Sequence, residues 1–199
     1  MPEPAAQPKL AIIAGPNGSG KSTFFDAYLR SEFPVFVNAD EISEGLYGVP
    51  EYSRPMAAAQ IASKERERLI AQGTSFAFET VFSRTDYWLD FIRLAKQSGF
   101  FVALFFLCTE DPVLNAGRVA TRVGGGGHDV PVDKIVSRYA GSIRTAVRAI
   151  GVVDELWLYD NSALNKSPLL IARFVAGRRD YVAANQPHWS EPFDVGSGE

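Results

Sequence analysis

A glycine-rich stretch near the amino terminus has the residue types and the spacing that bind a chain of phosphates. Residues 15–23 read GPNGSGKST and match the pattern Gly-x-x-x-x-Gly-Lys-Ser/Thr. Glycines let the backbone turn so that successive amides face one anion, and the N-terminus of a following helix adds partial positive charge. We therefore expect a nucleoside triphosphate, ATP, to bind here together with Mg2+.

Each residue of this loop has an expected role. Nucleotide contacts are expected from Gly15, Pro16, Asn17, Gly18, Ser19, Gly20, Lys21, Ser22 and Thr23. Lys21 brings a full charge to the β and γ phosphates and is also expected to be catalytic, while the Ser22 hydroxyl is the expected metal ligand. The apolar run LAIIA before the loop and the helical pattern after it provide the strand and the helix that such a loop requires.

A second polar group follows the second apolar segment, in the sequence VNADEI. A ligand of an open parallel sheet binds beyond the carboxyl ends of the strands, where Asn38 and Asp40 would stand beside the glycine loop. Asp40 can accept the proton of a substrate hydroxyl, so we expect it to be catalytic and expect both residues to contact the substrate. The alternatives are that Asp40 or Glu41 only caps the next helix, or that Asp40 holds a water bound to Mg2+.

A third polar group follows the third apolar segment, in FAFETVFS. Glu79, Thr80 and Ser83 would lie at the same edge of the sheet and are expected to contact the substrate. Glu79 can hydrogen-bond substrate hydroxyls or can orient Mg2+ through water, and the sequence alone leaves both roles open.

Arginines and a glycine run form the last group with chemical potential. Arg118 and Arg122 are four residues apart on one predicted helical face, so one can stack on adenine while the other offsets charge in the transition state. We expect Arg118 to bind the nucleotide and Arg122 to act in catalysis, with solvated arginines as the alternative. His128, in the glycine run, is counted with the substrate residues, although it can equally cap that segment.

Other polar residues have weaker indications. Asn161 ends the fifth apolar segment, where such sheets usually hold the base of a nucleotide; a plain turn explains it as well. The sequence KERER at 64–68 is interpreted as an exposed helix surface with no role. Arg138 and Arg144 are expected on a solvated helix face, with a position facing the cleft as the alternative.

The elements that must position these residues alternate along the chain. Apolar segments predict strands at residues 9–14, 35–38, 75–78, 100–107 and 155–159, and helical spacing covers residues 22–31, 55–72, 85–98, 111–122 and 132–150. Asp111 is the predicted N-cap of the fourth helix, with Pro112 at its first position. Alternating strands and helices favour an α/β fold of three layers, a mainly parallel sheet covered on both sides. The glycine run between two helices predicts a lid over about 118–138.

Length and composition fit one globular domain. The chain has 199 residues with 46% hydrophobic and 22% charged residues, and its net charge of -3 gives no overall attraction to nucleic acid or membranes. We expect a disordered arm at 1–8, the domain at 9–183 and a tail at 184–199 that is ordered only if Trp189 and Phe193 dock. Without an export signal or membrane span, and with one buried cysteine, Cys108, the protein is expected in the cytoplasm.

The motifs GPNGSGKST, NADEI, FETVFS and RVATRVGGGGHDVP together resemble the zeta-toxin branch of the P-loop kinases over about residues 10–162. The resemblance implies a P-loop kinase fold with five parallel strands in the order 2-3-1-4-5. It also implies phosphorylation of a sugar hydroxyl of UDP-N-acetylglucosamine and an antitoxin that blocks the ATP site. By the same resemblance Asp40 matches the catalytic base, Glu79 matches a glutamate that binds the sugar nucleotide, and Arg118 and Arg122 are similar to an arginine pair before the lid.

Departures from the family pattern concern the acceptor. Thr80, Val81, Phe82 and Ser83 stand where the toxins have a Gly-Thr pair and an arginine, and Ser63 falls near a position that carries another glutamate. The expected function is therefore an ATP- and Mg2+-dependent phosphotransferase acting on a small acceptor, with UDP-N-acetylglucosamine as one candidate. The alternatives are a metabolite or nucleoside kinase without a toxin role, and an ATP-binding module that acts through a protein partner; a role with nucleic acid is not expected.

Overall fold

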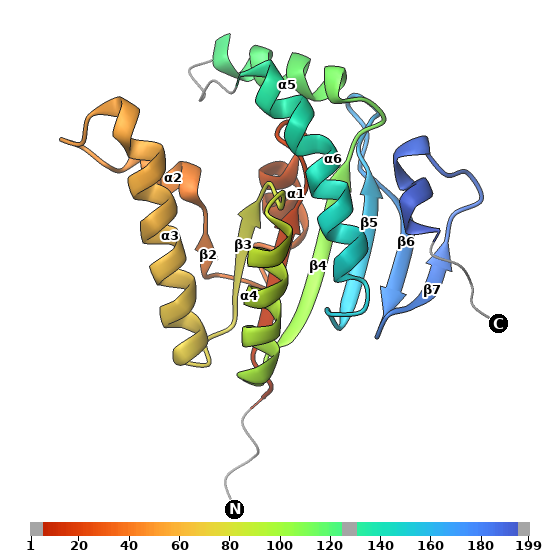
Figure 1. The fold of residues 1–199 in the computed structure, drawn as a ribbon, viewed down its shortest axis with the longest axis horizontal. Helices are drawn as coiled ribbons and strands as arrows, with labels where there is room; N and C mark the ends of the chain where they lie inside the picture. The colour runs from red at the N-terminus through yellow and green to blue at the C-terminus, as the bar shows by residue number, and fades with distance from the viewer. Residues whose placement is uncertain (1–5, 125–130, 195–199) are drawn as a thin grey trace, which may run out of the picture.

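A seven-stranded sheet forms the middle of the molecule (Figure 1). The computed structural model describes residues 6–124 and 131–194, with the backbone alone described at 122–124. The strands lie in the order β2-β3-β1-β4-β5-β6-β7. Their bounds are β1 (Lys9–Ala14), β2 (Phe36–Val37), β3 (Phe76–Thr80), β4 (Phe101–Cys108), β5 (Glu155–Asp160), β6 (Leu169–Val175) and β7 (Arg178–Val182).

The first five strands are parallel and have the predicted order 2-3-1-4-5. The predicted count of five strands is wrong, because β6 and β7 extend the sheet in antiparallel fashion beyond β5. These two strands form a hairpin whose turn holds Ala176 and Gly177 at φ angles of 48° and 78°. A short turn with positive φ at both central residues matches the twist of the strands that it joins.

The helices cover both faces of the sheet. They are α1 (Lys21–Tyr28), α2 (Ala39–Glu44), α3 (Arg54–Ala71), α4 (Thr85–Gln97), α5 (Pro112–Gly124) and α6 (Val132–Ala149), with short 3-10 turns η1 (Glu51–Ser53) and η2 (His188–Phe193). Figure 1 shows α3, α4 and α6 in front of the sheet and α1 behind it. Of the helices in the described ranges, none is long and apolar enough to cross a membrane.

Alternation along the strands divides the core into two layers, one on each face. Leu10 and Ile12 of β1 belong to the layer that α3, α4 and α6 cover. Ala11 and Ile13 point the other way and meet Phe24 and Phe25 of α1. Because successive side chains of a strand point to opposite faces, a parallel sheet covered on both sides has to be apolar at every position, as LAIIA is.

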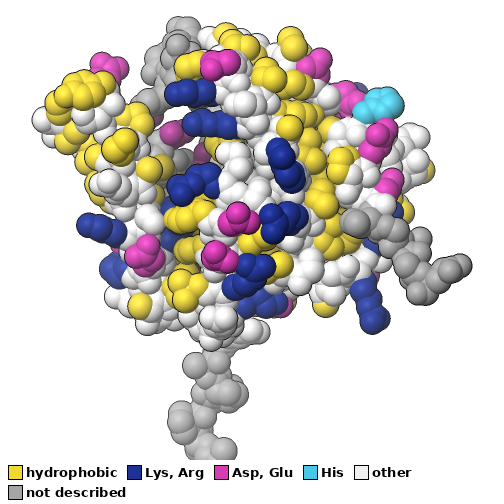
Figure 2. All heavy atoms as spheres, viewed as in Figure 1, with side chains coloured by type: hydrophobic (Ala, Val, Ile, Leu, Met, Phe, Trp, Pro, Cys, Tyr) yellow, Lys and Arg dark blue, Asp and Glu magenta, His cyan; other side chains and the backbone are white. Residues whose placement is uncertain are grey.

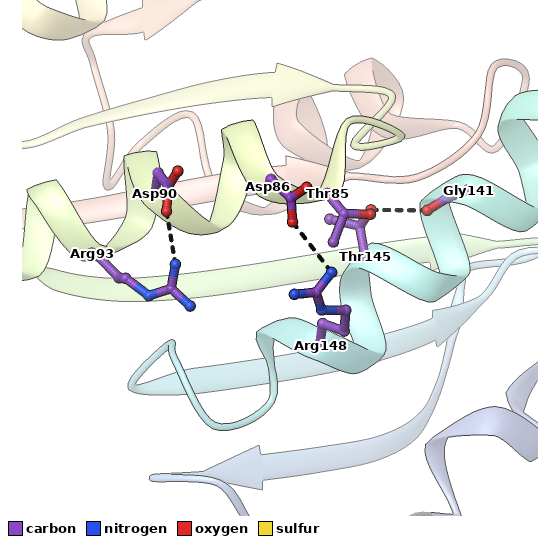
Figure 3. Close-up of polar contacts among 7 residues, drawn as sticks. All are labelled: Thr85, Asp86, Asp90, Arg93, Gly141, Thr145 and Arg148. Atoms are coloured by element: carbon purple, nitrogen blue, oxygen red, sulfur yellow. Dashed lines mark hydrogen bonds and ion pairs between the residues drawn. The ribbon is translucent and has the colours of Figure 1, made fainter.

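Polar contacts fix α4 against α6 (Figure 3). The hydroxyls of Thr85 and Thr145 lie 2.8 Å apart, and Thr145 also donates to the carbonyl of Gly141 at 2.9 Å. Arg148 and Asp86 form an exposed ion pair of 3.3 Å. Since α6 begins within the predicted lid region, these contacts hold the part of α6 beyond that region against α4.

The residues after β7 return to the sheet. Trp189 and Phe193 of η2 are buried, and each ring centroid lies 5.9 Å from that of Phe106 in β4. The indole of Trp189 donates to Asp160 at 3.0 Å. This segment, expected to be ordered only if the two aromatic residues dock, is therefore held in the core at both of them.

Candidate active site

A cavity of about 1290 Å3 lies at the carboxyl ends of the parallel strands. It exceeds the roughly 300–1,000 Å3 of a typical pocket for one small ligand, so two ligands can share it. Predicted site residues that line it are Asn17, Gly18, Gly20, Lys21, Ser22, Thr23, Asn38, Asp40, Glu79, Thr80, Ser83, Arg118 and Asn161. Gly15, Pro16 and Ser19 lie in the loop but not on the cavity wall. The side chain of Arg122 and all of His128 fall outside the described residues.

At two glycines of the loop, Gly15 and Gly20, a side chain would clash with neighbouring atoms. Gly15 has a φ of 145°, and a Cβ there would lie 2.0 Å from the carbonyl oxygen of Leu107. Gly20, with a φ of 90°, is the N-cap of α1, and a Cβ there would lie 2.4 Å from the Asn161 amide nitrogen. No acidic residue stands in the first turn of α1, so the positive end of this helix is open to an anion.

Lys21 is held within the loop. Its side chain is buried, and Nζ donates to the carbonyl of Pro16 at 3.1 Å. The ammonium therefore sits over the residues whose amides would surround a phosphate. Together with the N-terminus of α1, it gives the loop the donors and the charge that a triphosphate requires.

Glu79 and Ser22 meet at the mouth of the loop. β1 and β3 are parallel neighbours in the register Ile13 to Glu79, which places the end of β3 beside the loop. The Ser22 hydroxyl donates to a Glu79 carboxylate oxygen at 2.7 Å. Hydroxyl and carboxylate oxygens suit Mg2+, which is usually held by one or two such groups plus phosphates. In the described ranges no group of three His, Cys, Asp or Glu side chains gathers that could hold a metal alone.

Asp40 stands in the first turn of α2 with its carboxylate on the cavity wall. The helix is capped by Asn38, whose side-chain oxygen accepts from the Asp40 backbone N–H at 2.9 Å. The alternative that Asp40 or Glu41 caps this helix is therefore wrong. Asn38 is buried, so its contribution at the site is to fix the turn that carries Asp40.

Arg118 and Asn161 lie on the β5 side of the glycine loop, opposite to the side on which Glu79 and Asp40 lie. Arg118 donates to the carbonyl of Ser162 at 3.3 Å, and the Asn161 amide donates to the carbonyl of Ser19 at 2.8 Å. Asn161 thus holds the glycine loop in place. Contact of either side chain with a nucleotide base stays a prediction.

Helix α3 contributes residues that the sequence interpretation missed. The sequence 64–68 is not an exposed surface throughout, because Arg66 is only 7% exposed and lines the cavity with Ser63 and Tyr87. The signal was its position on the apolar stripe of the helix, four residues after Ala62 and three before Leu69. Arg138, expected on a solvated face, also lines the cavity and is half-buried.

The phenol of Tyr87, on the cavity wall beside Arg66, has a lowered pKa. Burial on its own raises the pKa of the phenol, but hydrogen bonds with Ser63 and Arg66 and the charges of Arg66 and Arg84 lower it, and the net shift of the pKa is downward. The Arg66 Nη2 lies 3.3 Å from the Tyr87 oxygen. Two cations, Arg66 of α3 and Arg84 just before α4, therefore act on this phenol.

Comparisons with solved structures show the same fold. The crystal structure of AvrRxo1-ORF1 and ORF2 with ATP matches with a TM-score of 0.70 and 19% identity, covering 89% of this chain and 61% of that chain. The PezAT chromosomal toxin–antitoxin system of Streptococcus pneumoniae matches with a TM-score of 0.62 and 17% identity, covering 84% and 72%. This chain thus spans about three fifths of the AvrRxo1 chain that it matches.

Comparisons of sequence reach the family. An uncharacterized protein of Haemophilus influenzae is 26% identical over 133 residues, which cover 67% of this chain and 94% of that protein. The family model AAA_33, described as an AAA domain, matches residues 10–139, from β1 through the glycine loop to α6. Because this match includes well over half of the chain, the protein belongs to that AAA domain family.

Proposed function

We propose that the protein is an ATP- and Mg2+-dependent phosphotransferase of the zeta-toxin type that transfers the γ-phosphate to a hydroxyl of a small acceptor, with UDP-N-acetylglucosamine as the first candidate. The observation that carries the proposal is that Lys21 of the glycine loop and Asp40 line one cavity. Asn38 caps the helix, so the Asp40 carboxylate is not used as the cap. A nucleotide-binding module without transfer has no evident need of such a carboxylate.

The sheet order separates two halves of the cavity. β4 and β5 lie on one side of β1, and Arg118 and Asn161 stand at this side, which we assign to the nucleotide. β3 and β2 lie on the other side, with Glu79 and Asp40 at their ends, and we assign this half to the acceptor, which Thr80 and Ser83 would also contact. The γ-phosphate of a nucleotide held by the glycine loop would then lie between the halves.

The proposed mechanism consists of positioning and charge stabilisation. Lys21 and the N-terminus of α1 hold the phosphates, and Arg122 offsets the charge that develops on the transferring group. Asp40 accepts the proton of the acceptor hydroxyl. In the same step the oxygen of that hydroxyl bonds to the γ-phosphorus, and the bond from this phosphorus to the ADP oxygen breaks. Ser22 and Glu79 provide oxygens that would suit Mg2+, and a bound Mg2+ would supply positive charge that offsets the charge of the phosphates.

The relatives support two parts of this proposal. AvrRxo1-ORF1 and ORF2 were crystallised with ATP, which supports ATP as the donor here. PezAT is a toxin–antitoxin system, which supports an antitoxin-like protein as a partner of this chain.

A transfer assay with γ-labelled ATP, Mg2+ and a panel of metabolites led by UDP-N-acetylglucosamine tests the proposal. We expect label on one acceptor, a loss of about 100-fold or more in Asp40→Asn, and ATP affinity in that variant close to that of the parent protein. Glu41→Gln is the matched control, because Glu41 is the next residue of the same helix and does not line the cavity.

The possible outcomes separate the functions. Label on UDP-N-acetylglucosamine names the zeta-type reaction, and label on another metabolite or a nucleoside names a different kinase. Tight ATP binding with no labelled product favours a module that acts through a protein partner. Normal turnover in Asp40→Asn would show that another group is the base.

A further inference from the structure

Arg66 is a buried cation surrounded by aromatic rings. Its guanidinium carbon lies 5.0 Å from the ring centroid of Phe78, 5.3 Å from that of Trp88 and 5.7 Å from that of Phe91. Its Nη2 donates to the Tyr87 hydroxyl at 3.3 Å, while its Nε is buried with no hydrogen-bond partner among the described residues. The Nε–H, one of the five donors of this guanidinium, therefore has no acceptor in the described part of the protein.

Among the described residues, Arg66 has no counter-ion. Within residues 6–121 and 131–194, no Asp or Glu lies within ion-pair distance of it, whereas Arg68, two residues on, pairs with Glu65. Burial of a charge without a paired anion is unfavourable, and the faces of aromatic rings offset only part of this cost. An anionic ligand bound at this place would offset the cost of burying the charge of Arg66.

An anion bound to Arg66 would lie in the acceptor half of the cavity. Arg66 lines the cavity from α3, beside Ser63 and Tyr87, and Phe78 beneath it is the β3 residue directly before Glu79. Of the residues that the structure describes, seven Lys and Arg residues line the cavity against the two acidic residues Asp40 and Glu79, in a chain of net charge -3. Figure 2 shows Lys and Arg side chains along the middle of the face on which Figure 1 draws α4 and α6.

The nucleotide accounts for only part of this positive charge. Lys21 and Arg118 lie in the half assigned to ATP, whereas Arg66 of α3 and Arg84 of the segment after β3 lie in the half assigned to the acceptor. A neutral acceptor would leave these cations without a partner in the complex.

We infer that Arg66 binds an oxyanion of the acceptor, a phosphate or a carboxylate that lies apart from the hydroxyl to be phosphorylated. The guanidinium has the planar donor geometry that suits a phosphate or a carboxylate, and the hydroxyls of Ser63 and Tyr87 lie beside it on the same wall of the cavity. This inference rests on the proposed function, because it takes the bound molecule to be the phosphate acceptor. Binding of an anion at Arg66 does not itself require that phosphate is transferred.

The test is a 15N-correlated NMR titration of the Arg Nε–H signals in the full chain, saturated with Mg2+ and a non-hydrolysable ATP analogue. Inorganic phosphate and malonate are the two probes, and N-acetylglucosamine is the neutral control. We expect a saturable shift of the Arg66 signal with at least one anion, none with the neutral sugar, and none of the Arg68 signal with any probe. The anion that binds more tightly tells a phosphate-bearing acceptor from a carboxylate-bearing one.

Variants then separate binding from folding. Arg66→Met keeps the apolar stem and removes the charge, so we expect it to weaken anion binding at least tenfold without lowering the midpoint temperature of unfolding; Arg68→Met is the matched control on the same helix. If Arg66→Met does not fold, Arg66→Gln is measured instead, and the titration of the unaltered protein stands independently.

The two proposals can fail separately. No saturable shift of the Arg66 signal with either anion, or unchanged anion affinity in a folded Arg66 variant, would overturn the inference even if an acceptor becomes labelled. An Arg66-dependent anion site in a protein that labels no acceptor would keep this inference and remove the phosphotransferase.

Discussion

The Ser22 hydroxyl donates a 2.7 Å hydrogen bond to Glu79 and so ties the first turn of α1 to the end of β3. The sequence alone left Glu79 with two roles, one at the acceptor and one at Mg2+. A carboxylate that already holds the expected metal ligand is well placed to orient Mg2+ through water, and this is the role we propose for it first.

Replacement of either partner in this contact is predicted to weaken the binding of ATP in the presence of Mg2+. We expect Glu79→Gln and Ser22→Ala each to lower the affinity about 10- to 100-fold, and the Mg2+ dependence of binding to become shallower. Isothermal calorimetry with and without Mg2+ measures this. Glu44→Gln, on the exposed end of α2, is the control, and an equal loss with and without Mg2+ would contradict a metal role for Glu79.

Removal of the cap of α2 is predicted to affect stability and turnover together. Asn38→Ala should lower the free energy of unfolding by about 1 kcal/mol because the Asp40 N–H loses its acceptor. It should also lower kcat more than it changes the affinity for ATP, because Asp40 is no longer held in place. Denaturant unfolding and the transfer assay measure the two effects, and Asn38→Asp, which keeps a capping oxygen, should restore most of both.

Two helical glycines are predicted to respond oppositely to alanine. A Cβ at Gly117 of α5 would meet nothing within 4 Å, so Gly117→Ala should stabilise the protein by up to about 1 kcal/mol. A Cβ at Gly141 of α6 would lie 3.3 Å from that of Ser83, so Gly141→Ala must push α6 from the segment after β3. Denaturant midpoints compare them; equal stabilisation by both would show that this junction is loosely packed.

The thiol of Cys108 is predicted to make stability depend on alkaline pH. Burial raises the pKa of this thiol from its ordinary value of 9.0 to about 12. The folded state therefore keeps a proton that the unfolded chain releases, and the contribution is complete below pH 9 and lost as the pH rises toward 12.

A comparison with Cys108→Ala isolates this effect from other titrating groups. The advantage of the parent protein over the variant in free energy of unfolding should shrink by about 1.4 kcal/mol for each pH unit above 9. A difference between the two proteins that stays constant from pH 8 to 11 would show that the thiol ionises freely in the folded state.

Much of the fold followed from hydrophobic periodicity. The strand at residues 9–14 has its predicted bounds, and α5 starts at Pro112 with the Asp111 side chain accepting from the Val113 N–H at 2.7 Å, as the capping pattern predicted. Each of these features depends on residues close together in the sequence, for which local patterns are reliable.

Features that depend on distant neighbours were missed. Strands β6 and β7 meet at the turn of Ala176 and Gly177, and hydrophobic periodicity along the chain does not show that β6 pairs with β5. Arg66 stands among charged residues, and only the rings of Phe78, Trp88 and Phe91 from β3 and α4 make its site buried. Most of the predicted site residues line one cavity, because the carboxyl ends of parallel strands share an edge, while their roles stay predictions.

The two ends of the sheet bear on how the protein behaves at high concentration. An exposed strand edge is a template for pairing with other chains, which leads to aggregation. At one end β2 is only two residues long, and at the other β7 carries Arg178, Arg179 and Asp180 in succession, all exposed. A short edge and a charged edge both discourage the addition of another strand, so concentrated preparations should resist assembly through the sheet.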